Sequence, residues 1–395
     1  MKTSRIDALI MEQEKLNTLS REAIEAVQLN KLNSLLRREH ERGGFYKDLP
    51  LRLDSLEQLK ALPFTTDAQL AEKGGAMLLV SQGQVQRVLS DATSGTTGAA
   101  KRVFYTLGDC ENTVRLFTAG LGELIFSGSR TMICMPFSGE YGLGELISEA
   151  VRRLGAEPLK LGVNLSYGQL KAAMDEYRPD SYVGFPTALL SMLRVCGRGS
   201  LQRALISGDA CPKSVTDAIE SLLGSRVFPH YGSREMGLAG AVCCPAHEGM
   251  HLRENIVIAE IIGDKGEALP KGEYGELAIT TIGMEAQPLI RYRTGDRTRI
   301  IPEPCLCGSA VLRLDAVGRK GGEELLALDE ALFALPDMVD YHAERAGGKL
   351  HILALTADEP DVSSISKAAA GAVVEARKIR LTDKPLYMGK RTITG

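Results

Sequence analysis

The 395-residue sequence contains no tryptophan, and its other aromatic side chains are only 11 tyrosines and nine phenylalanines. A surface that stacks the bases of single-stranded nucleic acid is therefore poorly supplied. Neither sign of charge dominates, because 47 lysines and arginines face 50 aspartates and glutamates, which gives a net charge of −3. Such a balance provides no electrostatic footprint for nucleic acid or for an anionic membrane. We expect neither as a partner.

Long apolar runs are also missing. No segment approaches the roughly 20 apolar residues that a membrane-spanning helix needs. The first 19 residues carry charges throughout, unlike the apolar centre of a signal peptide. These absences favour a cytoplasmic protein. The eight cysteines would then lie in a reducing compartment, where metal binding or simple burial is more common than disulfides.

What is present is a regular alternation of patterns. Residues 1 to about 45 show apolar positions at helical spacing, and from about 130 to 230 short apolar runs alternate with amphipathic segments. This alternation predicts a mainly parallel sheet covered by helices, and thus an α/β protein. The predicted strands are 131–135, 181–185, 203–206 and 226–228, and the predicted helices are 144–154, 187–195 and 212–223.

The pattern changes near residue 250. Strands separated by turn-rich segments predict a small β-rich subdomain over about 250–317, within a large domain that covers 1–317. Residues 318–395 predict a small α+β domain. The predicted elements are strands at 255–262, 275–281 and 289–293, followed by a helix at 325–335, a strand at 351–356 and a helix at 363–376.

A loop rich in hydroxyl groups, DATSGTTGAAK, runs from Asp91 to Lys101. Its glycines allow tight turns, and successive backbone N–H groups with hydroxyls make a concave site for an anion. Strand-like residues on both sides predict the tip of a hairpin. A Walker phosphate loop is excluded, because Ala100 precedes the lysine and Arg102 follows it. In isolation, a plain surface turn stays open as the alternative.

Three further stretches follow in order: ISGDA at 206–210, HYGSREMG at 230–237 and PLIRYRTGD at 288–296. Together with TSGTTG they resemble the adenylate-forming superfamily of acyl-CoA synthetases, and within it the phenylacetate–CoA ligase-like branch. The resemblance spans nearly the whole chain and includes FYKDL, GMHLREN and PCLCG. It implies a large adenylation domain and a small C-terminal lid.

The resemblance also implies roles for single residues. The hydroxyl-rich loop and Lys101 would hold the ATP phosphates, and Glu235 would hold Mg²⁺, a hard cation suited to a carboxylate. Asp296 would accept the ribose hydroxyls near Arg319. The implied nucleotide-binding residues are Thr93, Ser94, Gly95, Thr96, Thr97, Gly98, Ser207, Gly208, Asp209, Tyr231, Gly232, Ser233, Asp296 and Arg319. Each of three residues has a plain structural alternative: Asp296 could be an acidic residue of a turn, Glu235 a helix cap and Arg319 a surface cation.

Two more sites are expected. Lys390, in YMGKR, matches the lysine that similar enzymes place near their C-terminus at the substrate carboxylate and α-phosphate; a solvated terminal lysine is the alternative. An acid pocket beyond the carboxyl ends of the parallel strands would be lined by Phe137, Tyr141 and Phe185, for which core packing stays an equal alternative.

Cysteines and histidines suggest a second, metal-binding site. CCPAHEGMH at 243–251 lies about 60 residues before CLCG at 305–308, and local thiolate and imidazole pairs are the usual supply for tetrahedral Zn²⁺. With four protein ligands such a site would be structural. We expect Cys244, His251, Cys305 and Cys307 as ligands; His247 and Cys243 are competitors, and ordinary buried thiols are the alternative.

The resemblance implies an ATP-dependent carboxylate–CoA ligase that forms an acyl-adenylate from an aryl or arylacetic acid. Its substrates would be the acid, ATP with Mg²⁺, and CoA, and a homodimer stays open. The 76 residues after Arg319 make a short lid, and Lys320, Gly321 and Gly322 stand where a hinge aspartate is common. No CoA-guiding loop is recognisable. An enzyme with another acyl acceptor and an inert nucleotide-binding scaffold therefore remain alternatives.

Overall fold

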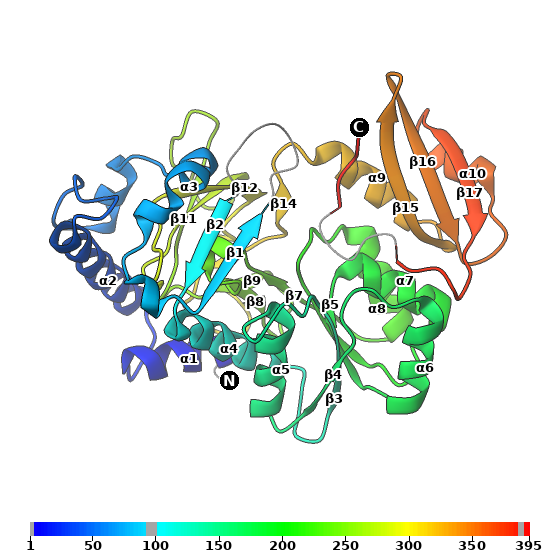
Figure 1. The fold of residues 1–395 in the computed structure, drawn as a ribbon, viewed down its shortest axis with the longest axis horizontal. Helices are drawn as coiled ribbons and strands as arrows, with labels where there is room; N and C mark the ends of the chain where they lie inside the picture. The colour runs from blue at the N-terminus through cyan, green and yellow to red at the C-terminus, as the bar shows by residue number, and fades with distance from the viewer. Residues whose placement is uncertain (1–3, 92–100, 386–390) are drawn as a thin grey trace. The chain divides into compact units, whose positions relative to one another are not determined.

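The computed structural model describes residues 4–91, 101–385 and 391–395, and these form two compact units. Unit 1 comprises Met1–Glu123 and His230–Val317, and unit 2 comprises Leu124–Pro229 and Gly318–Gly395. Figure 1 shows the elements of both. Among the described residues no helix is long and apolar enough to cross a membrane. The division of the chain into an adenylation domain and a lid at residues 317–318 stays a prediction.

In unit 1, N-terminal capping residues determine where the helices begin. Each starts after a serine or threonine whose side chain accepts a backbone N–H of the first turn, which satisfies a donor that the helix itself leaves unpaired. The capping residues are Ser4, Ser20, Thr66 and Thr106. The helices are α1 (Arg5–Glu14), α2 (Arg21–Arg42), α3 (Asp67–Lys73) and α4 (Leu107–Leu121).

The predicted hairpin is confirmed in unit 1. Strands β1 (Arg87–Asp91) and β2 (Lys101–Tyr105) pair antiparallel, with Asp91 opposite Lys101, and lie side by side in Figure 1. The β-rich part is confirmed as well, because β10, β11 and β12 form an antiparallel sheet. Its strands are β10 (Ile258–Ile262), β11 (Gly275–Thr280) and β12 (Tyr292–Thr298). In another sheet, β9 (Met250–Leu252) pairs antiparallel with both β8 (Ala241–Cys243) and β13 (Arg313–Leu314).

The predicted parallel sheet is present, in the order β4-β3-β5-β6-β7, and lies in unit 2 apart from His230 and Tyr231 at the end of β7, which belong to unit 1. Strand β4, at the edge, was not predicted, because Glu157-Pro-Leu-Lys160 has no apolar run and its proline is tolerated only where no ladder hydrogen bond is needed. The strands are β3 (Arg130–Cys134), β4 (Glu157–Lys160), β5 (Ser181–Gly184), β6 (Arg203–Ile206) and β7 (Phe228–Tyr231). The helices are α5 (Leu143–Arg153), α6 (Tyr167–Tyr177), α7 (Pro186–Cys196) and α8 (Lys213–Leu223).

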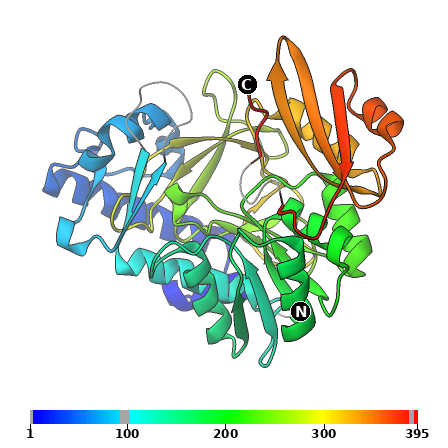
Figure 2. The same cartoon turned by 45° about the vertical axis from the view of Figure 1, so that its right-hand side comes forward.

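The C-terminal part of unit 2 is α+β, as predicted. A three-stranded sheet places β16 between antiparallel β15 and parallel β17 (Figures 1 and 2). The helix expected over 363–376 is wrong beyond Ala368, because Ala370 and Gly371 take positive φ angles of 38° and 88° and turn the chain into a strand. The elements are β14 (Gly318–Arg319), α9 (Glu323–Phe333), β15 (Met338–Ala346), β16 (Lys349–Thr356), α10 (Val362–Ala368) and β17 (Val373–Lys378).

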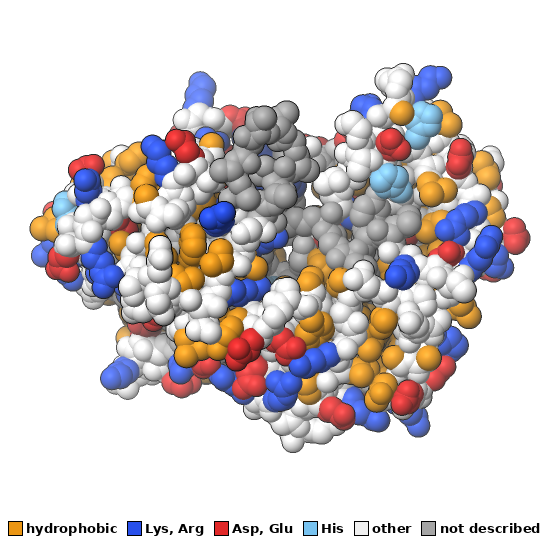
Figure 3. Space-filling model, in the orientation of Figure 1, with side chains coloured by type: hydrophobic (Ala, Val, Ile, Leu, Met, Phe, Trp, Pro, Cys, Tyr) orange, Lys and Arg blue, Asp and Glu red, His pale blue; other side chains and the backbone are white. Residues whose placement is uncertain are grey.

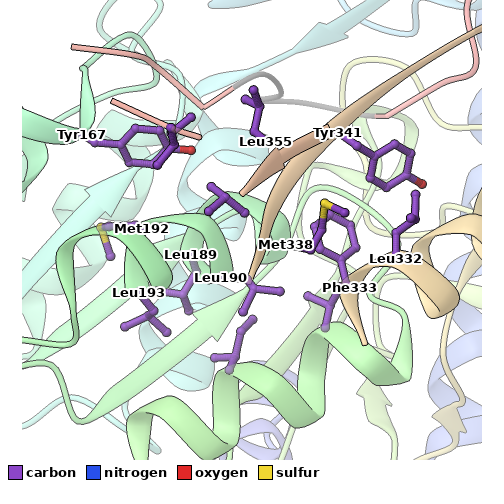
Figure 4. Close-up of a cluster of buried hydrophobic side chains, with 14 of the residues drawn as sticks. Tyr167, Leu189, Leu190, Met192, Leu193, Leu332, Phe333, Met338, Tyr341 and Leu355 are labelled. Carbon is purple, nitrogen blue, oxygen red and sulfur yellow. The ribbon is translucent and has the colours of Figure 1, made fainter. Parts of the chain in front are cut away.

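One apolar core joins both chain segments of unit 2. Figure 4 shows side chains of α7 facing those of α9 and β15, and all of the residues labelled there are buried. Burying one leucine, phenylalanine or methionine contributes about 1.5–3 kcal/mol, so this packing stabilises the position that the C-terminal segment takes here. The labelled residues are Tyr167, Leu189, Leu190, Met192, Leu193, Leu332, Phe333, Met338, Tyr341 and Leu355.

Charges on the surface are mixed. On the face drawn in Figure 3, basic and acidic side chains of the described residues are interspersed, and neither sign gathers into a dominant patch. This distribution agrees with the balanced composition.

Candidate active site

A lysine between two carboxylates forms the centre of the candidate site in unit 1. Lys101, the first residue of β2, places its Nζ 2.7 Å from Oε1 of Glu235, in the short 3₁₀ helix Arg234–Met236, and 2.8 Å from Oδ1 of Asp67. The side chain of Glu235 is 7% exposed and that of Asp67 is 56% exposed. The lysine therefore has one buried partner and one that faces solvent.

Electrostatics keeps this pair charged. Burial opposes charge on Lys101, but the charges and hydrogen bonds of Glu235 and Asp67 outweigh burial and raise the pKa of the lysine above its ordinary value. Burial alone would raise the pKa of Glu235, but the charge and hydrogen bond of Lys101 outweigh it and lower that pKa. At neutral pH Lys101 is therefore an ammonium and Glu235 a carboxylate.

Tyr292 completes the cluster. Its hydroxyl donates to Oδ1 of Asp67 and lies 3.4 Å from both Nζ of Lys101 and Oε1 of Glu235. Burial and the charge of Glu235 raise its pKa, so the hydroxyl keeps its proton. Sequence patterns did not single out Tyr292 or Asp67 as candidates, although Tyr292 belongs to the RYRTGD stretch.

The strand that carries RYRTGD was placed too early. We expected it over 289–293 because Thr-Gly-Asp resembles a turn, but β12 runs over Tyr292–Thr298. Buried and less buried residues alternate along it, so Tyr292, Thr294 and Asp296 share one face. This period of two is the sequence pattern that could have linked Tyr292 to Asp296.

Two residues of unit 1 that are predicted to bind the nucleoside, Tyr231 and Asp296, contact each other. The hydroxyl of Tyr231 donates to Oδ2 of Asp296 at 2.8 Å, and the backbone N–H of Asp296 donates to Oγ1 of Thr294 at 3.0 Å. Burial, then the Asp296 charge, raises the pKa of Tyr231, and the charge of Glu235 adds to this effect. Gly232 is sterically required, since a Cβ there would lie 2.2 Å from the carbonyl oxygen of Leu238. Its neighbour Ser233 precedes the 3₁₀ helix that carries Glu235.

In unit 2, the segment Ser207–Asp209 follows β6. Gly208 has a φ of 91°, and a Cβ there would lie 2.5 Å from the ring of Phe185, so only glycine fits. The carboxylate of Asp209 accepts two backbone N–H groups at 2.9 Å, from Ala210 and Arg391. The structure thus brings Phe185 to the predicted adenine segment.

The other two aromatic residues expected at the acid pocket, Phe137 and Tyr141, are also in unit 2. The ring of Phe137 packs where a Cβ on Gly144 would be, and Nζ of Lys160 lies 5.8 Å from its centre. Tyr141 is half-buried. Their roles stay predictions, as does that of Arg319, which is exposed in β14. The remaining predicted residues lie outside the described residues; they are Thr93, Ser94, Gly95, Thr96, Thr97, Gly98 and Lys390.

The predicted metal ligands converge in unit 1. One ligand atom from each of Cys244, His251, Cys305 and Cys307 lies within 4.8 Å of the others. Sγ of Cys244 is 3.7 Å from Sγ of Cys305, and Sγ of Cys307 is 3.6 Å from Nε2 of His251. With Zn–S bonds of about 2.3 Å, the edge of a tetrahedron measures about 3.8 Å. The donor set and its spacing therefore fit tetrahedral zinc.

The competing ligands are not part of this group. Nδ1 of His247 lies 3.9 Å from Sγ of Cys243, so these two residues contact each other. Burial lowers the pKa of His251 to about 4, which leaves its imidazole neutral and able to donate a lone pair. None of the eight cysteines forms a disulfide.

The chain is similar in sequence to known proteins. Residues 80–285 match the family model of the AMP-binding enzymes. The chain is 27% identical to a phenylacetate-coenzyme A ligase of Thermus thermophilus, over 84% of this chain and 80% of that relative. It is 30% identical to a phenylacetate-coenzyme A ligase of Aromatoleum evansii, over 73% of this chain and 69% of that relative.

Solved structures share the fold. A 2-hydroxyisobutyryl-CoA ligase in its postadenylation state superposes with a TM-score of 0.79 at 17% identity, over 96% of this chain and 91% of that one. A benzoate CoA ligase from Burkholderia xenovorans gives 0.50 at 15% identity, over 73% of this chain and 66% of that one. The predicted α/β fold class is confirmed. From the family match and these relatives, the chain belongs to the AMP-binding enzymes, in the family of the AMP-forming acid–CoA ligases.

Proposed function

We propose that the protein is a carboxylate–CoA ligase that works in two steps. A carboxylate oxygen attacks the α-phosphorus of ATP, pyrophosphate leaves, and an acyl-adenylate forms. The thiol of CoA then attacks the acyl carbon, AMP leaves, and a thioester forms. The observation that carries this proposal is the Lys101–Glu235 ion pair, which lies within the segment matched by the family model.

The cluster around Lys101 suits the handling of a triphosphate. Its ammonium would turn from Asp67 toward the β- and γ-phosphates at little cost, because an exposed ion pair is weak. Glu235, the buried partner of Lys101, would hold Mg²⁺, whose preference for carboxylate and phosphate oxygens matches this side chain. When bound, the cation neutralises charge on the phosphates. Positioning and charge stabilisation account for most of such a reaction.

The nucleoside would be bound by the other predicted residues. Asp296 would accept the ribose hydroxyls, with its carboxylate oriented by the hydrogen bond from Tyr231. Ser207, Gly208 and Asp209 of unit 2 would line the adenine, and Thr93–Gly98 would cradle the phosphates. Lys390 would approach the substrate carboxylate and α-phosphate, and the C-terminal segment would rotate about residues near Arg319 between the two steps.

The acid is proposed to be aryl or arylacetic. The names of the two relatives, both phenylacetate-coenzyme A ligases, support this choice. Phe185, buried beside Gly208, is the best placed of the three expected pocket residues. We place the enzyme in the cytoplasm, in keeping with eight cysteines that form no disulfide.

The test is an acid-dependent ATP–pyrophosphate exchange assay over aryl, arylacetic and aliphatic acids, followed by CoA-dependent release of AMP. We expect exchange with at least one arylacetic acid and a thioester product. Exchange without CoA-dependent AMP release would instead support another acyl acceptor. Binding of ATP by calorimetry without exchange for any acid would indicate a nucleotide-binding scaffold.

For the cysteine cluster we propose structural Zn²⁺, held by Cys244, His251, Cys305 and Cys307. Metal analysis of purified protein should find one zinc per chain, and Cys305→Ser should lower both the zinc content and the melting temperature. Cys196→Ser, in α7, is the matched control and should keep the metal. Purified protein without stoichiometric metal would refute the zinc proposal.

A further inference from the structure

Two hydroxyl groups from other elements hold the backbone around Glu235. The hydroxyl of Tyr105, the last residue of β2, donates to the carbonyl oxygen of Arg234 at 2.7 Å. The hydroxyl of Thr113, in α4, lies 2.6 Å from the carbonyl oxygen of Gly237. One contact precedes Glu235 in the chain and the other follows it, so the turn is attached on both sides.

The turn itself is short and weakly bonded. The 3₁₀ helix Arg234–Met236 has three residues, and Ser233 before it makes no side-chain capping hydrogen bond. Two of its backbone hydrogen bonds are long, at 3.3 Å from Met236 to Ser233 and 3.1 Å from Gly237 to Arg234. Such helices have poorer hydrogen-bond geometry than α-helices. The two hydroxyls therefore add attachment that the turn does not supply alone.

Both donors are buried. The side chain of Tyr105 is 1% exposed and that of Thr113 is 2% exposed. Burial, then the charge of Glu235, raises the pKa of Tyr105, so its hydroxyl keeps its proton and donates. Because water does not readily reach these places, removing either hydroxyl takes a partner from a carbonyl group without replacing it.

Strand β2 contacts this turn twice. Lys101 and Tyr105 lie four residues apart on the strand, so their side chains point to the same face. Lys101 pairs with the carboxylate of Glu235 at 2.7 Å, while Tyr105 bonds the backbone one residue before it. The strand thus fixes both the carboxylate and the main chain from which it extends.

We propose that Tyr105 and Thr113 are positioning residues for the Mg²⁺ site at Glu235. They act through Glu235, so this inference rests on the proposed function. Each hydroxyl bonds a carbonyl group of the turn and thereby orients the carboxylate. Groups that orient a metal ligand in this way typically cost about 10- to 100-fold in metal affinity or activity when they are removed.

The first test is Tyr105→Phe in the full-length enzyme, which removes the hydroxyl and keeps the ring. Acid-dependent pyrophosphate exchange is measured over a range of Mg²⁺ concentrations, and ATP binding is measured by calorimetry with Mg²⁺ and with EDTA. We expect half-maximal exchange to need about tenfold more Mg²⁺. ATP binding should weaken by a similar factor with Mg²⁺ and stay at the wild-type level with EDTA.

Helix α4 offers a matched pair of variants. The hydroxyls of Thr113 and Thr118 lie 3.1 and 2.8 Å from the carbonyl oxygens four residues before them, and Thr113 in addition reaches Gly237. Thr113→Val should therefore raise the Mg²⁺ requirement as Tyr105→Phe does, while Thr118→Val keeps the wild-type requirement. Thr113→Ser retains the hydroxyl and should restore it. If Tyr105→Phe does not fold, the threonine variants carry the test.

An unchanged Mg²⁺ requirement in Tyr105→Phe or Thr113→Val would overturn the role of that residue. Equal weakening of ATP binding with Mg²⁺ and with EDTA, or the same change in Thr118→Val, would reduce the effect to a general loss of structure and overturn the inference. Failure of the proposed function has a different signature, since wild type itself would then show no exchange with any acid. A wild-type Mg²⁺ requirement in Glu235→Gln would also overturn the inference, because the turn would carry no metal ligand to position.

Discussion

Lys101 in unit 1 and Arg391 in unit 2 each meet two carboxylates, yet the two clusters are built differently. One partner of Lys101, Asp67, has a side chain that is 56% exposed. The partners of Arg391, Asp329 and Asp340, are 7% and 1% exposed. Two aromatic rings cover the guanidinium of Arg391 as well.

The difference separates a cation that can change partners from one that cannot. An ammonium beside an exposed carboxylate loses little when a phosphate takes that place. Removing an enclosed guanidinium leaves buried carboxylates uncompensated, which is costly. We infer that the open cluster meets substrate and that the closed cluster fixes the chain. Four substitutions can break or sharpen this contrast.

Asp340→Ala should have the largest effect. It leaves the buried guanidinium with one carboxylate fewer, and removing one partner of a buried ion pair typically costs about 3–5 kcal/mol. Urea unfolding of the variant and wild type measures the loss in free energy of unfolding. A loss no larger than that of a surface substitution would show that the cluster around Arg391 is not closed.

Lys101→Met should lower the rate of adenylation rather than the stability of the fold. Removing a cation aimed at developing charge typically costs about 10²–10³ in rate, so pyrophosphate exchange should fall by that factor. The control is Lys213→Met, an exposed lysine that pairs only one turn along its own helix and should exchange at the wild-type rate. Wild-type exchange in Lys101→Met would remove the open cluster from the mechanism.

The contributions of the two clusters to the free energy of unfolding should change with pH in opposite directions. Burial raises the pKa of Asp329 to about 6, although Arg391 offsets part of the effect. The folded state therefore favours protonated Asp329, and this stabilisation is present below about pH 4 and lost as the pH rises through 6. The pKa of Glu235 is lowered, so its contribution is present above pH 4.5 and lost at lower pH.

Unfolding free energies between pH 4 and 7 test this assignment. Asp329→Asn stays neutral, so the variant should lack the part of the stability loss that wild type shows as the pH rises to 6. Identical pH profiles for the two proteins would contradict the assignment to Asp329.

Asp67→Asn should have the smallest effect on stability. Its ion pair with Lys101 is half-exposed, and such pairs contribute about 0–1 kcal/mol. The melting temperature should hardly change. A large drop would mean that the cluster around Lys101 is as closed as the one around Arg391.

Sequence patterns predicted those features that local chemistry determines. The hairpin before the hydroxyl-rich loop, the strand–helix alternation of unit 2 and the grouping of Cys244, His251, Cys305 and Cys307 all follow from spacing and residue type. Asp67 could not be found this way, because its role depends on contacts with residues far away in the sequence. Strand β12 was misplaced because its Thr-Gly-Asp resembles a turn.

We propose that Glu235 holds the Mg²⁺ of Mg·ATP in the open cluster. The most direct test measures acid-dependent pyrophosphate exchange in wild type and Glu235→Gln over a range of Mg²⁺ concentrations. We expect the variant to exchange more slowly and to need more Mg²⁺ for half-maximal rate, since an amide binds a hard cation less well than a carboxylate. Equal rates with the same dependence on Mg²⁺ would contradict the claim.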